Sequence, residues 1–188
     1  MRFFTSLSFL LFASVALMAQ GFAYLNLTTA DGAERSIAAA QVKITFADGV
    51  LVAVSSKGGA EMGIDADGNS RITIKGGYVF TGGGNQGGSS STIGSASQGY
   101  YWLTGKSFSE TNYYTLADAS NNNIITIKLP CNVNSSYSLI SAPQMVKGST
   151  YTIKSSTTAP TDATSEFEGF YLGSSAKGTT TVASFTAQ

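Results

Sequence analysis

Apolar and polar residues alternate with a period of two in short stretches along the chain. Such a period places successive side chains on opposite faces of a β-strand. After residue 23, no stretch carries the apolar i, i+3, i+4, i+7 pattern of an amphipathic helix. The strands predicted in this way cover residues 24–28, 41–46, 50–54, 71–75, 78–80, 123–129, 136–140, 150–154, 166–172 and 179–185. The pattern therefore predicts an all-β protein.

Two of the predicted hairpins are similar to each other. Residues 43–52 read basic, Ile, Thr, apolar, a turn that ends in Gly and a second strand, and residues 71–80 repeat this order without a gap. The second copy begins 28 residues after the first, with Arg71 in the place of Lys43. Repeats of this length are typical of solenoids, in which stacked units bury a core jointly. The alternative is a pair of ordinary β-hairpins.

A stretch rich in Gly and Ser, residues 82–99, divides the chain. Its composition is that of a loop or linker rather than of a packed element. Aromatic residues concentrate directly after it. We therefore expect a solenoid-like region over residues 24–99, which ends in this loop, and a small antiparallel β unit over residues 100–188.

The N-terminus has the three parts of a secretory signal peptide. Met1 and Arg2 form a positive start, residues 3–18 are uncharged and apolar, and small residues follow. The apolar run is too short for a membrane span, and no second run in the chain is long enough. We expect removal of residues 1–23, with cleavage after Ala19 as the weaker alternative. The mature protein would then be secreted or displayed at the cell surface.

Composition excludes several classes of function. Charged residues make up 12% of the chain, with 11 basic and 11 acidic side chains, and no basic cluster marks a surface for nucleic acid. The chain has no His and one Cys, which excludes a Ser-His-Asp triad, a His-ligated zinc site and an internal disulfide. No nucleophile and base stand together in the sequence, so we expect a protein that is not an enzyme.

Two segments resemble a bacterial family of non-catalytic carbohydrate-binding proteins. Residues 63–77 contain Gly-Ile-Asp, a polar turn with Gly, an apolar-x-apolar strand and Gly-Gly, as a rung of that family does. Residues 139–153 are similar to the closing segment of the family in the spacing of Ser, Pro, Gly and Tyr. The family forms a right-handed parallel β-helix, pectate-lyase-like in shape. The resemblance implies short β-helix-like rungs in residues 24–99, polysaccharide binding, and calcium as a structural ion.

Asp65, Asp67 and Asn69 are the candidate metal ligands. Alternate positions of an extended segment point the same way, and carboxylate and amide oxygens are the ligands that calcium takes. The alternative is an Asx turn ahead of Gly68, in which an Asp side chain bonds its own backbone. The turn is favoured, because Asp-x-Asp-Gly lacks the further spaced ligands of a complete calcium loop.

The candidate carbohydrate-binding residues are aromatic, and they are Tyr100, Tyr101, Trp102, Tyr113 and Tyr114. The C–H face of a sugar stacks on a flat ring, and Tyr and Trp add a polar tip. Asn residues at 112 and 121–123 would supply hydrogen bonds to sugar hydroxyls. The alternative is that these rings fill the core. Alternation places Tyr100 and Trp102 on one face and Tyr101 on the other, and we expect at least one member of each Tyr pair in the core.

The sequence thus favours a secreted, non-catalytic protein that binds a polysaccharide. The first alternative is a surface structural or adhesin-like protein, which would self-associate through an exposed sheet edge. The second is a pectate-lyase-like enzyme, in which a basic residue beside calcium would abstract a proton. Lys57, Arg71 and Lys75 are available for that role, and nothing in the sequence selects among them.

Overall fold

The computed structural model describes residues 44–56, 63–64, 72–84, 92–167 and 169–188. This part of the chain forms thirteen β-strands. It contains no helix that is long and apolar enough to cross a membrane. The prediction of an all-β protein is confirmed for these residues, whereas the predicted signal peptide, residues 1–23, lies outside them.

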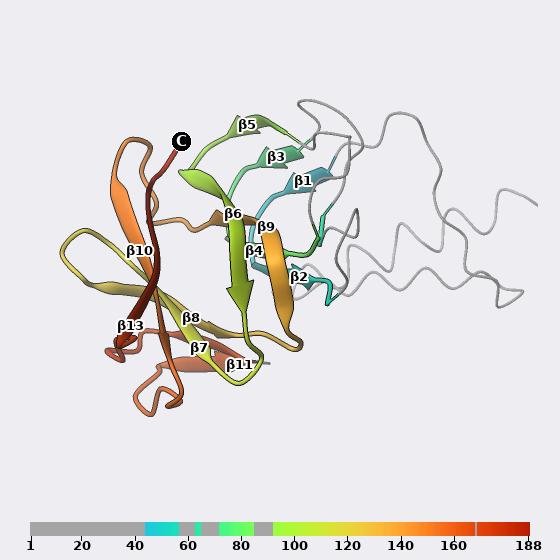
Figure 1. Ribbon diagram of the computed structural model, residues 1–188. Coiled ribbons are helices and arrows are strands. Elements are labelled where there is room, and N and C mark those ends of the chain that lie inside the picture. The colour runs from blue at the N-terminus through green and yellow to red at the C-terminus, as the bar shows by residue number, and fades with distance from the viewer. Residues whose placement is uncertain (1–43, 57–62, 65–71, 85–91, 168) are drawn as a thin grey trace, which may run out of the picture.

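The strands form three sheets (Figure 1). The three-stranded sheet has the order β1 (Ile44–Phe46), β3 (Ile72–Ile74), β5 (Ile93–Ala96). The four-stranded sheet has the order β2 (Val50–Val54), β4 (Tyr78–Gly82), β9 (Val133–Ser141), β6 (Tyr100–Phe108). The six-stranded sheet has the order β11 (Ser165–Phe167), β12 (Phe170–Leu172), β8 (Asn123–Lys128), β7 (Tyr113–Ala117), β10 (Thr150–Ser156), β13 (Thr180–Thr186).

The two similar stretches of the sequence pair with each other directly. β1 runs parallel to β3 with Ile44 opposite Ile72, and β2 runs parallel to β4 with Val50 opposite Tyr78. Both registers join residues that are 28 positions apart, which is the spacing of the sequence repeat. The repeat therefore forms two stacked units rather than two independent hairpins. The right-handed β-helix that the family resemblance implies stays a prediction.

Two turns, one between β1 and β2 and one between β3 and β4, stack closely on each other because one of them contains Gly77. The N–H of Lys75 donates to the carbonyl of Phe46 at 2.7 Å, and the N–H of Tyr78 donates to the carbonyl of Gly49 at 2.8 Å. Gly77 has a φ of +80°, and a Cβ atom there would lie 2.6 Å from the oxygen of Gly49. Only glycine combines this conformation with so near a backbone neighbour.

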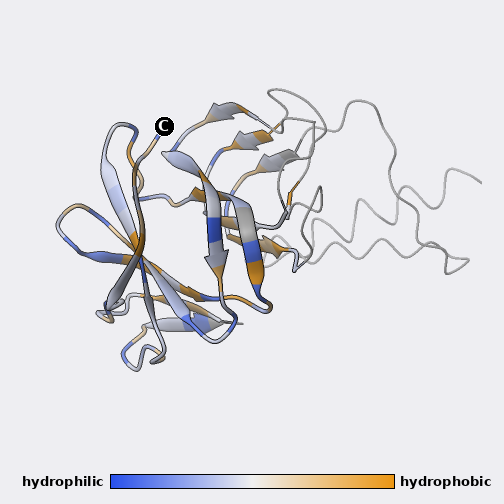
Figure 2. Cartoon of the chain, in the orientation of Figure 1, coloured by the Kyte–Doolittle hydropathy of each residue, from blue (hydrophilic) through white to orange (hydrophobic). Residues whose placement is uncertain are grey.

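The four-stranded sheet lies between the other two, and strand alternation divides its side chains between two cores. Val79 and Leu139 point to the three-stranded sheet, whereas Phe80 and Ile140 point to the six-stranded sheet. The small core consists of Ile64, Ile72, Ile74, Val79 and Leu139. The large core consists of Phe80, Leu103, Phe108, Tyr114, Leu116, Ile125, Ile127, Leu129, Val133, Ile140, Ala142, Met145, Tyr151, Ile153, Ala183, Phe185 and Ala187. Figure 2 accordingly shows hydrophobic and hydrophilic stretches that follow one another along β6 and β9.

The structure corrects the prediction of an unpacked loop over residues 82–99 for residues 92–99, whereas residues 85–91 lie outside the described residues. β5 lies within this stretch and pairs in parallel with β3, with Ile72 opposite Ile93. Ile93 packs against the small core, and Gln98 donates from Nε2 to the carbonyl of Gly77 at 2.7 Å and to the hydroxyl of Ser141 at 2.8 Å. Ile93 supplies the apolar contact of this strand to the small core, and parallel pairing with β3 supplies its backbone hydrogen bonds.

The four-stranded sheet also joins the two regions into which the sequence divides the chain. β4 from the first region pairs antiparallel with β9 from the second, with Val79 opposite Ser141 and Phe80 opposite Ile140. Where this pairing ends, the N–H of Leu139 donates to the buried hydroxyl of Thr81 at 3.1 Å. The C-terminal residue reaches the same sheet, since the N–H of Gln188 donates to the carbonyl of Tyr100 (Figure 1).

Candidate functional site

The predicted aromatic residues on β6 face two different cores. Tyr100 and Trp102 pack against the small core, and Tyr101 packs against the large core, so the predicted alternation is confirmed. Tyr101 stacks on Phe185 with ring centroids 4.5 Å apart, and all three residues are half-buried. Tyr101 therefore cannot share a surface with Tyr100 and Trp102, as the alternation predicts, because neighbouring residues of a strand point in opposite directions.

The pair on β7 is divided in the same way. Tyr114 is buried, as expected of one member of the pair, and its hydroxyl accepts from the N–H of Ser109 at 2.5 Å. Tyr113 is half-buried on the opposite face, where Lys128 lies 5.2 Å from its ring centroid and Tyr171 packs against its edge. The five aromatic residues thus lie in several separate environments, and the side chain of Tyr114 is 3% exposed.

The candidate metal ligands Asp65, Asp67 and Asn69 lie outside the described residues, so the calcium site stays a prediction. Within the described ranges, no group of three or more His, Cys, Asp or Glu side chains is placed to hold a metal ion. Cys131 is half-buried and forms no disulfide there.

A different set of side chains converges on a hollow of about 330 Å³, which we name the polar hollow. It is open at the surface where the ends of the four-stranded and six-stranded sheets meet. Its wall is formed by Tyr78, Asp118, Asn122, Asn123, Ile124, Gln144, Leu172 and Gly173. Carboxylate, amide, phenol and aliphatic groups therefore face one space, although they come from segments as far apart as β4 and β12.

The turn between β7 and β8 presents the carboxylate of the polar hollow. The N–H of Asn122 donates to Oδ1 of Asp118 and the side-chain amide of Asn122 donates to Oδ2, both at 2.8 Å. Asn121 takes the left-handed conformation between them, with a φ of 62°, which Asn adopts more readily than most residues. These hydrogen bonds from Asn122 lower the pKa of Asp118 below its ordinary value, so Asp118 is ionised at neutral pH.

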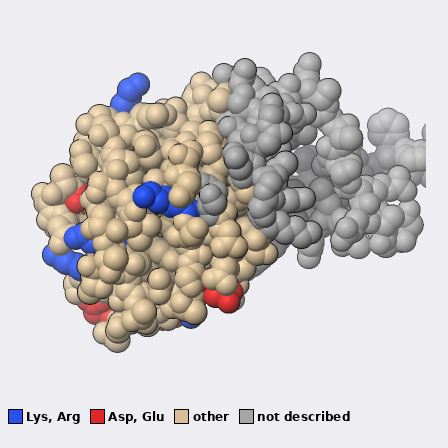
Figure 3. Space-filling view, viewed as in Figure 1, with Lys and Arg blue, Asp and Glu red and all other residues tan. Residues whose placement is uncertain are grey.

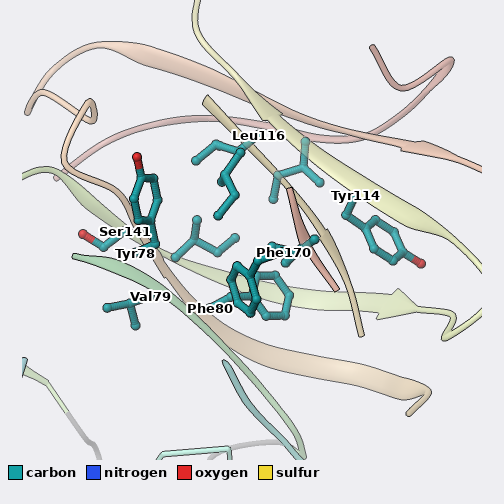
Figure 4. A pocket seen from close by; sticks show the side chains of 11 residues that line it. Tyr78, Val79, Phe80, Tyr114, Leu116, Ser141 and Phe170 are labelled. Carbon is teal, nitrogen blue, oxygen red and sulfur yellow. The ribbon is translucent and has the colours of Figure 1, made fainter. Parts of the chain in front are cut away.

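A hydrogen bond from Gln144 orients the ring of Tyr78 in the polar hollow. Nε2 of Gln144 donates to the hydroxyl of Tyr78 at 2.9 Å, across 66 residues of sequence. Below Tyr78 lies a small apolar cavity of about 30 Å³, which Phe80, Leu116 and other core side chains surround (Figure 4). Tyr78 therefore closes the large core on one side and forms the floor of the polar hollow on the other.

Asn123 anchors the third side of the polar hollow. Its amide donates to the hydroxyl of Thr126 at 3.1 Å and to the carbonyl of Ala176 at 2.9 Å. Its Oδ1 atom is buried and accepts no hydrogen bond within the described part of the chain. The bond to Ala176 ties the 173–178 segment to β8 of the six-stranded sheet, and the bond to Thr126 holds the amide of Asn123 along its own strand.

The wall of the polar hollow combines hydrogen-bonding groups with apolar surface. Carboxylate and amide groups can accept and donate hydrogen bonds to several hydroxyls at once, and the phenol ring and aliphatic side chains offer apolar surface. Among the described residues, Asp118 is the only Asp or Glu that lines the hollow.

Sequence reasoning singled out Asn122 and Asn123 as polar neighbours of a sugar, but it missed Tyr78, Asp118 and Gln144. In the sequence, Tyr78 stands out only as a strand residue of the repeat, and Gln144 belongs to the segment that resembles the family's closing motif. The contact between them depends on the pairing of β4 with β9, which no local pattern predicts. The site is interpreted from its own side chains, because no family model, curated protein or solved structure matches this chain.

Proposed function

We propose that this protein binds a polysaccharide without cleaving it, and that the polar hollow is the binding site. The observation that carries the proposal is the convergence of the Tyr78 ring, the Asp118 carboxylate and the amides of Asn122 and Gln144 on one space. The resemblance of residues 63–77 and 139–153 to a carbohydrate-binding family supports the same class of ligand. Export by the predicted signal peptide would bring the protein to extracellular glycans.

The chemistry of a sugar matches this wall. Each hydroxyl both donates and accepts, so a carboxylate that accepts and an amide that does both satisfy it in two directions. Carbon-bound hydrogens of the pyranose ring pack on an aromatic face or on aliphatic side chains, which Tyr78, Ile124 and Leu172 provide. A volume of about 330 Å³ is at the lower end of the range for small-molecule sites, which fits one or two sugar units of a longer chain.

Binding of oligosaccharides to the mature protein tests the proposal. Gln144 is exposed, and Gln144→Ala removes one amide together with its bond to Tyr78. A net hydrogen bond of about 1 kcal/mol corresponds to roughly fivefold weaker binding. Asn134→Ala is the matched control, because Asn134 is an exposed amide on β9 that does not line the hollow. Calorimetric titration with an array-selected glycan should show a loss for Gln144→Ala alone, and equal affinities for both variants would contradict the site.

A second candidate function, a structural or adhesin-like component, is favoured by the edge of the three-stranded sheet. β5 is the last strand of this sheet among the described residues, and residues 94–97 are exposed. The N–H of Ser97 donates inward to Ile74 at 2.8 Å, so the backbone groups of Ala96 point outward in a parallel ladder. A groove of about 450 Å³ follows this edge and includes Val146, which is 61% exposed. A second copy of the chain would add a strand here.

Proline substitutions separate this function from loss of folding. Ala96→Pro removes an outward N–H, and we expect it to abolish concentration-dependent association in sedimentation velocity while the melting temperature changes little. Ser97→Pro removes the inward bond to Ile74 and should lower the melting temperature. A wild-type protein that remains monomeric at high micromolar concentration would contradict the second function and leave the first untouched.

A further inference from the structure

The wall of the polar hollow carries a single charge. Among the described residues that line it, Asp118 is the only Asp, Glu, Lys or Arg, and the other polar groups are the amides of Asn122, Asn123 and Gln144 and the hydroxyl of Tyr78. Charged side chains are sparse on the molecule as a whole, as the face in Figure 3 illustrates. The described wall therefore carries one formal charge, which is negative.

Asp118 is held so that it can still accept bonds from a ligand. Each of its two oxygens accepts one hydrogen bond from Asn122, the backbone of Ser120 contributes a weaker one, and a carboxylate has about four acceptor sites in all. The remaining acceptor capacity can take a hydrogen bond from a sugar hydroxyl, which is charge-assisted and therefore strong. The same charge repels a carboxylate or sulfate on the ligand.

Lys154 and Lys177 do not offset the repulsion between Asp118 and an acidic ligand. Lys154 donates from Nζ to Oδ1 of Asn121 at 2.6 Å, so its ammonium is engaged behind the β7–β8 turn. Lys177 is near enough to contribute to the low pKa of Asp118, but its effect is smaller than those of the bonds from Asn122, and it does not line the hollow. Neither lysine presents a donor at the wall to pair with an anionic sugar.

We infer that the polar hollow takes neutral sugar units and excludes uronic acids and sulfated sugars, with the Asp118 carboxylate as the specificity-determining group. This inference rests on the proposed function, since it names the class of glycan for the same site. Neutral hydroxyls satisfy the carboxylate, whereas an acidic substituent at the same place leaves two like charges a few ångströms apart in a partly enclosed space. Discrimination is thus achieved by repulsion as well as by attraction.

A chemically matched pair of ligands tests the inference most sharply. Oligogalacturonate and its fully methyl-esterified form have the same sugar and linkage and differ in charge, and neutral cello-, xylo-, manno- and galacto-oligosaccharides complete the panel. We expect at least one neutral ligand to bind, and the free acid to bind at least tenfold more weakly than the best neutral one. The deficit of the acid should shrink between 20 mM and 500 mM salt, because salt screens repulsion at a solvent-open site.

The second part of the test compares the same ligands on the variant Asp118→Asn. The amide is nearly isosteric and uncharged, so the difference between acid and ester should fall to within about threefold, while Gln144→Ala should weaken neutral and acidic ligands alike. If Asp118→Asn disturbs the turn between β7 and β8, the salt dependence of acid binding by the wild-type protein still measures the repulsion from Asp118. An acid that binds as well as the best neutral ligand, in a manner sensitive to Gln144→Ala, would overturn the inference and leave the proposed function standing. Absence of binding to every probe would overturn both.

Discussion

The indole ring of Trp102 stacks on the phenol ring of Tyr137, with centroids 4.7 Å apart and planes inclined by 23°. The two residues are diagonal neighbours, because β6 and β9 pair Trp102 with Leu139 and Thr104 with Tyr137. Trp102 also packs against the small core, and burial raises the pKa of Tyr137. One face of the only tryptophan in the chain is thus committed to packing between two strands.

Replacement of Trp102 should therefore reduce stability rather than ligand affinity. Trp102→Ala removes the stacked pair and part of the lining of the small core, so we expect a loss of about 2 kcal/mol in the free energy of unfolding, below the range for fully buried tryptophan because Trp102 is half-buried. Urea unfolding followed by circular dichroism measures it, and Trp102→Phe should lose less. Weaker glycan binding at unchanged stability would instead favour the aromatic surface expected from the sequence.

The stacked turns of the repeat make a second prediction. Gly77 and Gly148 have nearly equal positive φ values, +80° and +83°. A Cβ atom at Gly77 would meet the backbone oxygen of Gly49 at 2.6 Å, whereas nothing lies within 4 Å of one at Gly148. We expect Gly148→Ala to cost about 1 kcal/mol from backbone strain alone, and Gly77→Ala to cost clearly more in the same denaturant titration. Equal losses in the free energy of unfolding for the two variants would contradict this prediction, because they would mean that the two stacked turns can move apart to admit a Cβ atom at residue 77.

Local patterns were sufficient to predict several of the strands, including an uninterrupted apolar one. Residues 50–54 were predicted with the observed bounds of β2, and the 28-residue repeat anticipated the register of two parallel strand pairs. Residues 166–172 were predicted as one strand, but they form the hairpin of β11 and β12, in which Phe167 lies opposite Phe170. Gly169, which has a φ of +85°, marks the reversal in the sequence, because glycine permits this conformation.

The candidate site was less accessible to sequence reasoning. Aromatic residues attract attention because they stack on sugars, but Tyr114 and Tyr101 are needed by the large core, which has the same preference for flat apolar groups. The groups of the polar hollow, by contrast, are ordinary turn and strand residues that meet only after β4 has paired with β9 and β7 has paired with β8. Composition identifies residues that are able to bind, and topology decides which of them meet.

Tyr171 gives a prediction for alkaline pH. Burial and a hydrogen bond to Glu166 raise the pKa of Tyr171 from 10.0 to about 12. Because the folded state holds this proton more tightly than the unfolded chain, the stabilisation is fully present below pH 10 and is lost as the pH rises from 10 to 12. Tyr171→Phe should remove this part of the alkaline decline in melting temperature, and Glu166→Gln should reduce it. An unchanged decline in Tyr171→Phe would show that other groups control unfolding at high pH.

Asp162 organises the loop next to the six-stranded sheet. Its Oδ1 accepts from the hydroxyl of Ser174 at 2.7 Å, and its Oδ2 accepts from the N–H of Ser175 at 2.9 Å and from the hydroxyl of the same residue. The hydrogen bonds from Ser175 and then Ser174 lower the pKa of Asp162 from 3.8 to about 2. The carboxylate thereby joins residues on both sides of the β11–β12 hairpin.

The last prediction follows from the sign of this shift. The folded state binds the Asp162 proton less tightly than the unfolded chain, so the stabilisation is complete above pH 3.8 and is lost as the pH falls to about 2. Asp162→Asn cannot ionise, and its melting temperature should fall less steeply than that of the wild type between pH 4 and pH 2. Ser175→Ala should flatten the curve in part, because it removes the strongest of the contacts. Glu110→Gln, the loss of another exposed carboxylate, is the control and should keep the wild-type slope; parallel curves for the wild type and Asp162→Asn would contradict the role of this loop in acid stability.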